Sequence, residues 1–414
     1  MIKNNPFTSD EFNAIWLKHF NNSKPSYSFD FIEHVVFYKS SLLPLFINVG
    51  KNLTKGIFYE LISDTNDFKG KAFLVYDVPD YFNVDDNVGL VNKNLGLIKI
   101  FQYNGYVMDL TDFDSAEAYR KNQFKKHNKR YIRWSHIQRL ETCFNITEEF
   151  LYGDISNEKY EFIFDHFFRL LNQRFEGKHT DYHHLEDKKW AFYKELILPL
   201  IRSKKASFLV IYNDGIPVGI NLNYHADKIL FKAITVFDTD YSKFSIGKLS
   251  VLKLLDWCYE HEYSFSDFSK GYFDYKDIWS NLKYDFNYHV LYDKTSLLAT
   301  IIAKSIVAKY ALKTFLRKHK INRLYRKFMF KFRGSKSHYK PITEIDTESL
   351  LDFNSTEAYE VVDVKEDHYD YLRSHVNNFL FSNPEPFNNI RVYKHKIENT
   401  VIIQGSHKAI KLNF

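Results

Sequence analysis

The stretch YSKFSIGKLSVLKLLDWCYEHEYSFSDFSKGYFDYKDIW, residues 241–279, decides the fold of this 414-residue chain. A polar loop opens a strongly apolar helix over about 248–261, a β-rich run follows at 263–268, and FDYKDIW begins a further helix. Because an apolar strand at 229–237 precedes the loop, the order predicts a β-loop-α-β crossover within one sheet.

The residues before this crossover supply more strands of the same sheet. Two apolar runs, 207–212 and 218–224, flank Asp214-Gly215, which is the strongest hairpin signal in the chain. Helical periodicity over 160–175 and 190–201 precedes them, and a last strand is expected at 288–292. A meander followed by a crossover predicts an α+β, mixed-sheet fold.

The first 110 residues predict another mixed unit. A helix over 7–20 is expected, with Ser9 or Asp10 as its cap. Short β-branched and aromatic runs predict strands at 31–38, 43–49, 57–62 and 72–78, and a basic helical stretch lies between 117 and 141. We divide the chain into domains at 1–150 and 151–293, a basic helical segment at 294–340 and a small acidic α+β unit at 341–414.

The composition excludes several classes of protein. Only 14 glycines argue against a Gly-rich dinucleotide fold, and two cysteines cannot build a disulfide framework or a thiolate-rich zinc site. Neither a signal peptide nor a spanning helix is evident, so a soluble cytoplasmic protein is the expectation.

The net charge of +6 is unevenly distributed. Residues 294–340 hold 14 Lys or Arg and no acidic residue, which leaves −8 for the rest of the chain. Steps of three and four between apolar residues predict amphipathic helices here. These helices fit a solvated face, an anionic membrane surface or a phosphate-bearing partner such as an acyl carrier protein or tRNA. Docking of the acidic unit against this segment is a further interpretation.

The segment HTDYHHLEDKKW, residues 179–190, invites a metal interpretation. His179 and His183 are four residues apart, but Thr180 stands where a zincin has Glu. A polar loop over the acceptor site is the favoured interpretation, and we predict no metal.

The order of these elements, with NPFTSDEFNAIWLKHF, YRKNQFKKHNKRYIRW, FLVIYNDGIPVGINLNYH and FDYKDIW, resembles the GNAT acyltransferase superfamily. More narrowly, it resembles the acetyltransferase-like branch of cellulose and exopolysaccharide biosynthesis, which is related to Fem-type aminoacyltransferases. The resemblance covers about residues 5–293 and implies two GNAT-like mixed-sheet domains.

The resemblance implies a donor site at the start of the central helix. A GNAT domain splays two parallel strands, an acyl-carrying pantetheine lies in the gap, and the pyrophosphate meets the helix start. Here Ser245 is expected to cap that helix, Gly247 to admit a phosphate, and Lys243 and Lys248 to add charge. Only one glycine stands where the superfamily loop usually has two or three.

The branch pattern of a strand ending in Asp-Phe, then Gly, then Tyr-Lys and Trp implies the catalytic residues. Asp267 is the candidate base, Tyr275 the candidate acid, and Lys276 the holder of an anionic group. The substrate-binding candidates are Lys270, Gly271 and Trp279, although Trp279 also suits a packing role.

The sequence therefore predicts an N-acyltransferase that uses acetyl-CoA or another acyl thioester and a small-molecule or sugar-linked amine, without a metal. The alternatives are a Fem-like enzyme using aminoacyl-tRNA, and a non-catalytic GNAT scaffold at the inner face of the membrane.

Overall fold

The computed structural model describes residues 2–22, 24–40, 43–84, 92–126, 133–176, 186–318, 345–347 and 358–414. Predicted features within 127–132, 177–185 and 319–344 therefore lie outside the described residues. These include the histidines of the 179–190 segment and residues 319–340 of the basic helical segment.

The N-terminal half alternates short helices and strands. Its helix α1 begins after Ser9, whose hydroxyl accepts from the Phe12 N–H as a cap, as predicted. The elements are α1 (Asp10–Phe20), β1 (Ser26–Phe29), β2 (Ile32–Lys39), β3 (Leu45–Asn48), β4 (Glu60–Leu61), β5 (Ala72–Pro79), the 3-10 helix η3 (Asp80–Phe82), β6 (Leu95–Asp109), α3 (Ala116–Lys126) and α4 (Trp134–Cys143).

The following half contains the predicted meander and crossover. Asp214 and Gly215 both have positive φ (48° and 78°), so the hairpin turn is of the type that its sequence predicts. The elements are β7 (Ile146–Leu151), α5 (Asn157–Glu176), α6 (Asp187–Arg202), β8 (Ala206–Asn213), β9 (Ile216–Ala226), β10 (Ile229–Phe237), the 3-10 helix η5 (Thr239–Phe244), α7 (Ile246–Glu260), β11 (Phe265–Lys270), α8 (Asp274–Trp279), β12 (Leu282–Asp293) and α9 (Leu297–Lys318).

A small second sheet ends the chain. It consists of β13 (Ile345–Thr347), β14 (Tyr359–Val361), β15 (Arg391–His395), β16 (Thr400–Gln404) and β17 (Ala409–Asn413), and the helix α11 (Asp370–Ser382) accompanies it.

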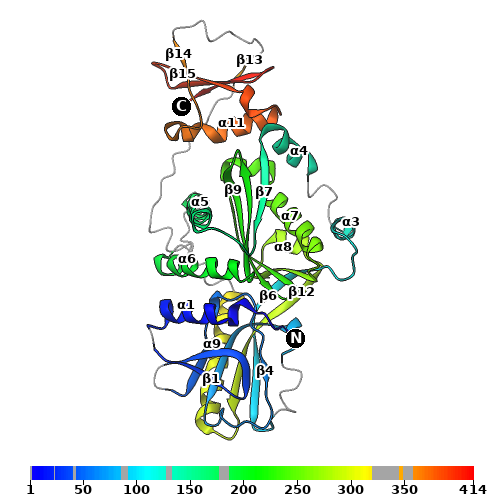
Figure 1. The fold of residues 1–414 in the computed structure, drawn as a ribbon, viewed down its shortest axis with the longest axis vertical. Helices are drawn as coiled ribbons and strands as arrows, with labels where there is room; N and C mark the ends of the chain where they lie inside the picture. The colour runs from blue at the N-terminus through cyan, green and yellow to red at the C-terminus, as the bar shows by residue number, and fades with distance from the viewer. Residues whose placement is uncertain are drawn as a thin grey trace.

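The described strands of the two halves form one continuous sheet of 12 strands, so the mixed α/β class is confirmed. The order is β1-β2-β3-β5-β12-β6-β11-β10-β9-β8-β7, with β4 paired to β2. β6 pairs with β12 along most of its length and with β11 at its end, so it lies in both halves (Figure 1). The predicted boundary at 150 falls within β7, and β12 lies beside β5 of the N-terminal half. The domain limits stay a prediction.

Helices cover both faces of this sheet. Apolar residues of α5 and α6 pack on one face of β8–β10, and those of α7 pack on the opposite face (Figure 1). α9 is the described part of the basic segment. Its residues Ala299, Ile302, Ala303, Ile306 and Tyr310 are buried against the sheet, which is the packed face expected of an amphipathic helix.

The C-terminal unit packs on the end of the second half, at α4 and η5 (Figure 1). Phe381 of α11 contacts the rings of His136 and Phe244, Arg139 donates to the Phe381 carbonyl, and Asn377 donates to the Asp240 carbonyl. Residues 319–340 of the basic segment lie outside the described residues, so docking of this unit against that segment stays a prediction. This unit therefore borders the loop that leads into α7.

Candidate functional site

Strands β10 and β11 form a fork. They pair in parallel only through Ile229–Phe265, Leu230–Ser266 and Phe231–Asp267, and β10 then continues to Phe237 beside β9 alone. The β9–β10 register shifts between Lys232 and Ile234, directly after the last parallel pair. Such a bulge re-aims a strand, and here it separates β10 from β11.

Beyond Phe231, the edge of β10 that faces β11 carries backbone N–H and C=O groups that do not bond to β11. We call it the open edge. The Asp238 N–H bonds to the Val218 carbonyl of β9, so the backbone groups of Phe237 and Thr235 face the other way. Beyond Phe231 this edge of β10 does not pair with β11, so an extended ligand can bond to it as an added strand.

Asp267 lies at the apex of the fork and is fully buried. Its carboxylate accepts from the Tyr81 hydroxyl (2.9 Å), the Tyr284 hydroxyl (2.5 Å) and the Ser269 N–H (2.6 Å). Burial raises the pKa of Asp267 to about 6, against the opposing effect of these donors. The carboxylate is thus held by the protein itself and has no exposed surface toward a substrate.

Lys276 of α8 lies close to Asp267 and is 6% exposed. Its ammonium donates to the carbonyls of Lys270 (2.9 Å) and Ser269 (3.3 Å). Burial, followed by the charge of Lys55, lowers the pKa of Lys276 to about 7. The structure therefore brings together Asp267 and Lys276, which are two of the candidate catalytic residues.

The other predicted residues around the turn have different environments. Lys270 forms an ion pair with buried Asp77 (2.5 Å), and Gly271 has a φ of +98° in the turn after β11. Tyr275 is 38% exposed and packs edge-on against Phe268. Tyr275 is therefore a solvent-accessible tyrosine that lies beside β11.

Trp279 does not fit the substrate-binding role assigned from sequence. It is 1% exposed, and its ring packs edge-on against Phe124 at 5.1 Å. Its backbone carbonyl accepts from the Tyr119 hydroxyl (2.6 Å). Because an interior ring cannot reach a ligand, the packing interpretation holds and the substrate-binding one is corrected.

The predicted side-chain cap at the start of α7 is absent. Ser245 occupies the N-cap position with a φ of +63°, but its side chain makes no capping bond. Gly247 lies beside Phe237, and a Cβ there would come within 3.1 Å of that ring. Lys243 is exposed, whereas the pKa of half-buried Lys248 is lowered by burial and then by the Arg133 charge. Gly247 is thus explained by close packing against β10.

Two cations that sequence reasoning missed also face the fork. Lys232 is buried in β10, with its ammonium 5.7 Å from the Phe268 ring centre. Arg174, near the end of α5, donates to the Thr235 carbonyl (2.5 Å) on the open edge. The sequence could have indicated Lys232, because it is a single lysine within the apolar run ILFKAITVF. No sequence pattern marks Arg174.

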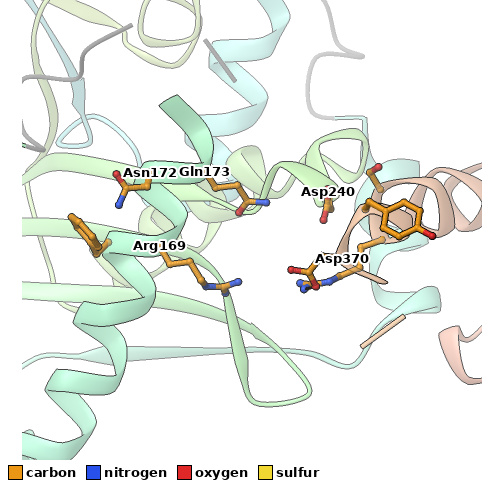
Figure 2. Close-up of a pocket in the computed structure, with 9 residues that line it drawn as sticks. Arg169, Asn172, Gln173, Asp240 and Asp370 are labelled. Carbon is orange, nitrogen blue, oxygen red and sulfur yellow. Dashed lines mark hydrogen bonds and ion pairs between the residues drawn. The ribbon is translucent and has the colours of Figure 1, made fainter. Parts of the chain in front are cut away.

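A polar groove of about 670 Å³ opens beside the fork, between α5 and the C-terminal unit (Figure 2). Arg169 and Gln173 of α5 face Asp240 of η5 and Asp370 of α11 across it. Burial raises the pKa of Asp240 to about 6, and the nearby Asp238 charge adds to the effect. The C-terminal unit thus forms one wall of the approach to η5.

Comparison with known proteins agrees with this geometry. Residues 136–277, which contain the hairpin, the fork and the first residues of α8, match the family model described as an acetyltransferase (GNAT) domain. This segment is a GNAT domain. The matched residues include Tyr275 and Lys276 and end two residues before Trp279.

Solved structures with a similar fold are distant in sequence. A Bacteroides thetaiotaomicron protein of unknown function is 9% identical (70% of this chain, 91% of that one, TM-score 0.44), and L-PGS from Bacillus licheniformis is 13% identical (74% and 98%, TM-score 0.40). FemX is 10% identical, covering 62% of this chain and 83% of that one, with a TM-score of 0.42. At these TM-scores the likenesses carry no argument about activity. No curated protein matches the chain.

In the part of the chain that the structure describes, no helix is long and apolar enough to cross a membrane.

Proposed function

We propose that this protein is an N-acyltransferase that moves an acyl group from a thioester donor to a primary amine. The observation that carries the proposal is the fork of the GNAT domain, in which β10 and β11 separate directly after the Phe231–Asp267 pair. The open edge of β10 supports binding of an acyl-pantetheine, with its thioester near the apex.

The proposed reaction is a direct displacement. The amine nitrogen attacks the thioester carbon, the new C–N bond forms, and the C–S bond breaks as the carbonyl is restored. One amine proton is lost and the thiolate gains a proton, so no oxidant or metal is required. An ammonium held near the apex, as Lys276 is, stabilises the negative charge that develops on the carbonyl oxygen.

The buried carboxylate has a positioning role in this proposal. Asp267 holds Tyr81 of η3 and Tyr284 of β12 through their hydroxyls, and these tyrosines come from segments about 200 residues apart in sequence. Asp267 thereby holds β11 in place, and the turn that follows β11 leads to α8 and Lys276. Tyr275 is proposed to protonate the leaving thiolate, because it is the accessible phenol of α8.

The resemblance to the exopolysaccharide branch supports an amino sugar of a surface-polysaccharide precursor as the acceptor. The test is release of free thiol from acetyl-CoA in the presence of a panel of amino sugars, with mass spectrometry of the product. Lys276→Met should lower kcat by about 10²-fold, as loss of a charge-stabilising donor does. Lys283→Met, which changes an exposed lysine on β12, should retain the wild-type rate. No acylated amine with any donor thioester would contradict the proposal.

One observation favours aminoacyl-tRNA as an alternative acyl donor. Arg174 occupies the Thr235 carbonyl, one of the groups that a pantetheine strand would use. A Fem-like aminoacyl ester of tRNA does not need that edge. Binding of aminoacyl-tRNA that weakens steeply with salt, together with no binding of acetyl-CoA, would favour this alternative.

A further inference from the structure

The helix α9 has apolar side chains on two opposite faces. One face is buried against β5, β6 and β12 of the sheet. The other carries four large apolar residues that are between 49% and 78% exposed, namely Leu297, Leu298, Ile301 and Leu312. We call these four residues the outer stripe. At 3.6 residues per turn they lie within about 100° of one another around the helix axis and extend over about 22 Å of its length.

Small residues occupy the same side of α9 between these four. Ser305 and Ala308 lie there, and both are exposed. The Ser305 hydroxyl donates to the Ile301 carbonyl of the preceding turn (2.8 Å), so it bonds to the helix backbone. A helix face that only meets water carries polar side chains. Exposed apolar residues that lie together, as these do, mark an interaction surface.

Lysines border the outer stripe on both sides. Lys304 lies next to one edge of it and Lys309 next to the other, with Lys313 one turn further along. Among the described residues, none of these three lysines forms an ion pair with a carboxylate. Burial, and then the charges of Lys309 and Lys313, lower the pKa of Lys51, so a further cation lies close to them. Because residues 294–340 contain no acidic residue, this face fits an anionic partner.

A lipid surface accepts both parts of this face. The apolar side chains of an amphipathic helix enter the boundary between headgroups and acyl chains, and lysine stems extend so that their ammonium groups reach anionic headgroups. An RNA backbone would neutralise the lysines but leave the leucines in water. The apolar stripe therefore favours a membrane over a nucleic acid as the anionic partner.

We infer that the outer stripe of α9 binds to the surface of an anionic lipid membrane, with Lys304 and Lys309 contacting the lipid phosphate groups. The helix lies in the interface and does not cross the bilayer, since its opposite face is buried in the protein. The contact uses neither β10 nor β11, so the inference goes beyond the proposed acyl transfer and does not depend on it.

The test is flotation of the full chain with vesicles of phosphatidylcholine and phosphatidylglycerol, compared with vesicles of phosphatidylcholine alone. Wild type should bind the anionic vesicles at least about tenfold more tightly than the neutral ones. The double variant Ile301→Gln/Leu312→Gln removes apolar contact area and should weaken that binding at least about tenfold. Ile397→Gln, which changes a 91% exposed isoleucine of the C-terminal unit, should bind like wild type.

The lysines are tested by their salt dependence. Lys304→Gln/Lys309→Gln should bind anionic vesicles at least about tenfold more weakly than wild type at low salt, and the difference should shrink as salt rises. Lys228→Gln, which changes an exposed lysine paired with Glu262, should bind like wild type.

Absence of binding to anionic vesicles, or equal binding to both kinds of vesicle, would overturn the inference. Equal binding of wild type and Ile301→Gln/Leu312→Gln would overturn it as well. A wild-type dimer in sedimentation velocity that this double variant does not form, together with no lipid binding, would instead assign the outer stripe to contact with a second copy of the chain.

Discussion

Replacing Lys232 with methionine should stabilise the protein in the absence of ligand. Methionine keeps the length and the unbranched shape of the lysine stem, so it fills the same space beside Phe268. It removes a buried ammonium whose pKa is lowered by burial. The substitution therefore removes a cost to folding while leaving the packing intact.

The magnitude follows from linkage. The pKa of Lys232 falls from 10.5 to about 7, and each pKa unit is worth about 1.4 kcal/mol. Because the folded pKa lies below the unfolded one, the cost is fully present below pH 7 and disappears as pH rises toward 10.5. The upper limit is about 4 kcal/mol at pH 7.5 and about 2 kcal/mol at pH 9. Loss of the cation–π contact subtracts about 0.5–1 kcal/mol.

Urea unfolding followed by tryptophan fluorescence measures this difference at both pH values, with Lys228→Met as the exposed control. We expect Lys232→Met to unfold at higher urea than wild type at pH 7.5, with less than half of that gain at pH 9. The Lys228 variant should differ little at either pH, since its ammonium is exposed. A gain that is absent, or that does not shrink between pH 7.5 and 9, would refute the reasoning.

Three further substitutions test separate parts of the structure. Trp279→Ala should cost about 3–5 kcal/mol of stability in urea unfolding, because its ring is buried against Phe124; a stability like wild type would show that the ring is not part of the core. Tyr284→Phe removes a donor that lowers the pKa of Asp267, so the acidic limb of the rate–pH profile should move to higher pH, and an unmoved limb would separate Asp267 from catalysis. Gly215→Ala should destabilise by about 1 kcal/mol because φ is +78°, and an unchanged unfolding midpoint would argue against the hairpin turn.

The regular elements of the GNAT domain were predictable because their local signals agree with their environment. β10 was predicted with its observed limits, since an uninterrupted β-rich run lies between two turn signals. The hairpin around Asp214-Gly215 was also predictable, because the turn itself requires positive φ at both residues.

The longest strand was missed for a physical reason. β6 contains Gly96, Asn104 and Gly105, which break any apolar or alternating pattern. Its partners explain these residues: a Cβ at Gly105 would lie 2.2 Å from the Tyr284 ring, and one at Gly96 would lie 2.6 Å from Tyr292. Because both rings belong to β12, the glycines make sense only after the long-range pairing has formed.

The candidate site likewise depends on residues that are distant in sequence. Asp267 and Lys276 were readable because they lie within one short stretch that resembles a known pattern. Tyr81 and Lys55, which surround them in the structure, come from the N-terminal half and carried no local signal. Burial by distant strands, rather than a motif, gives these residues their properties.

Amide hydrogen exchange with and without acetyl-CoA tests the proposed donor site most directly. Binding in the fork should protect the amides of 232–237 on β10 and 245–248 at the start of α7, since these are the open strand edge and the helix start. The β15–β17 amides of the small sheet, which lies outside the fork, should exchange at the same rate in both states and serve as the internal reference. Unchanged exchange over 232–237 and 245–248 at saturating acetyl-CoA would contradict the assignment of the fork as the acyl-donor site.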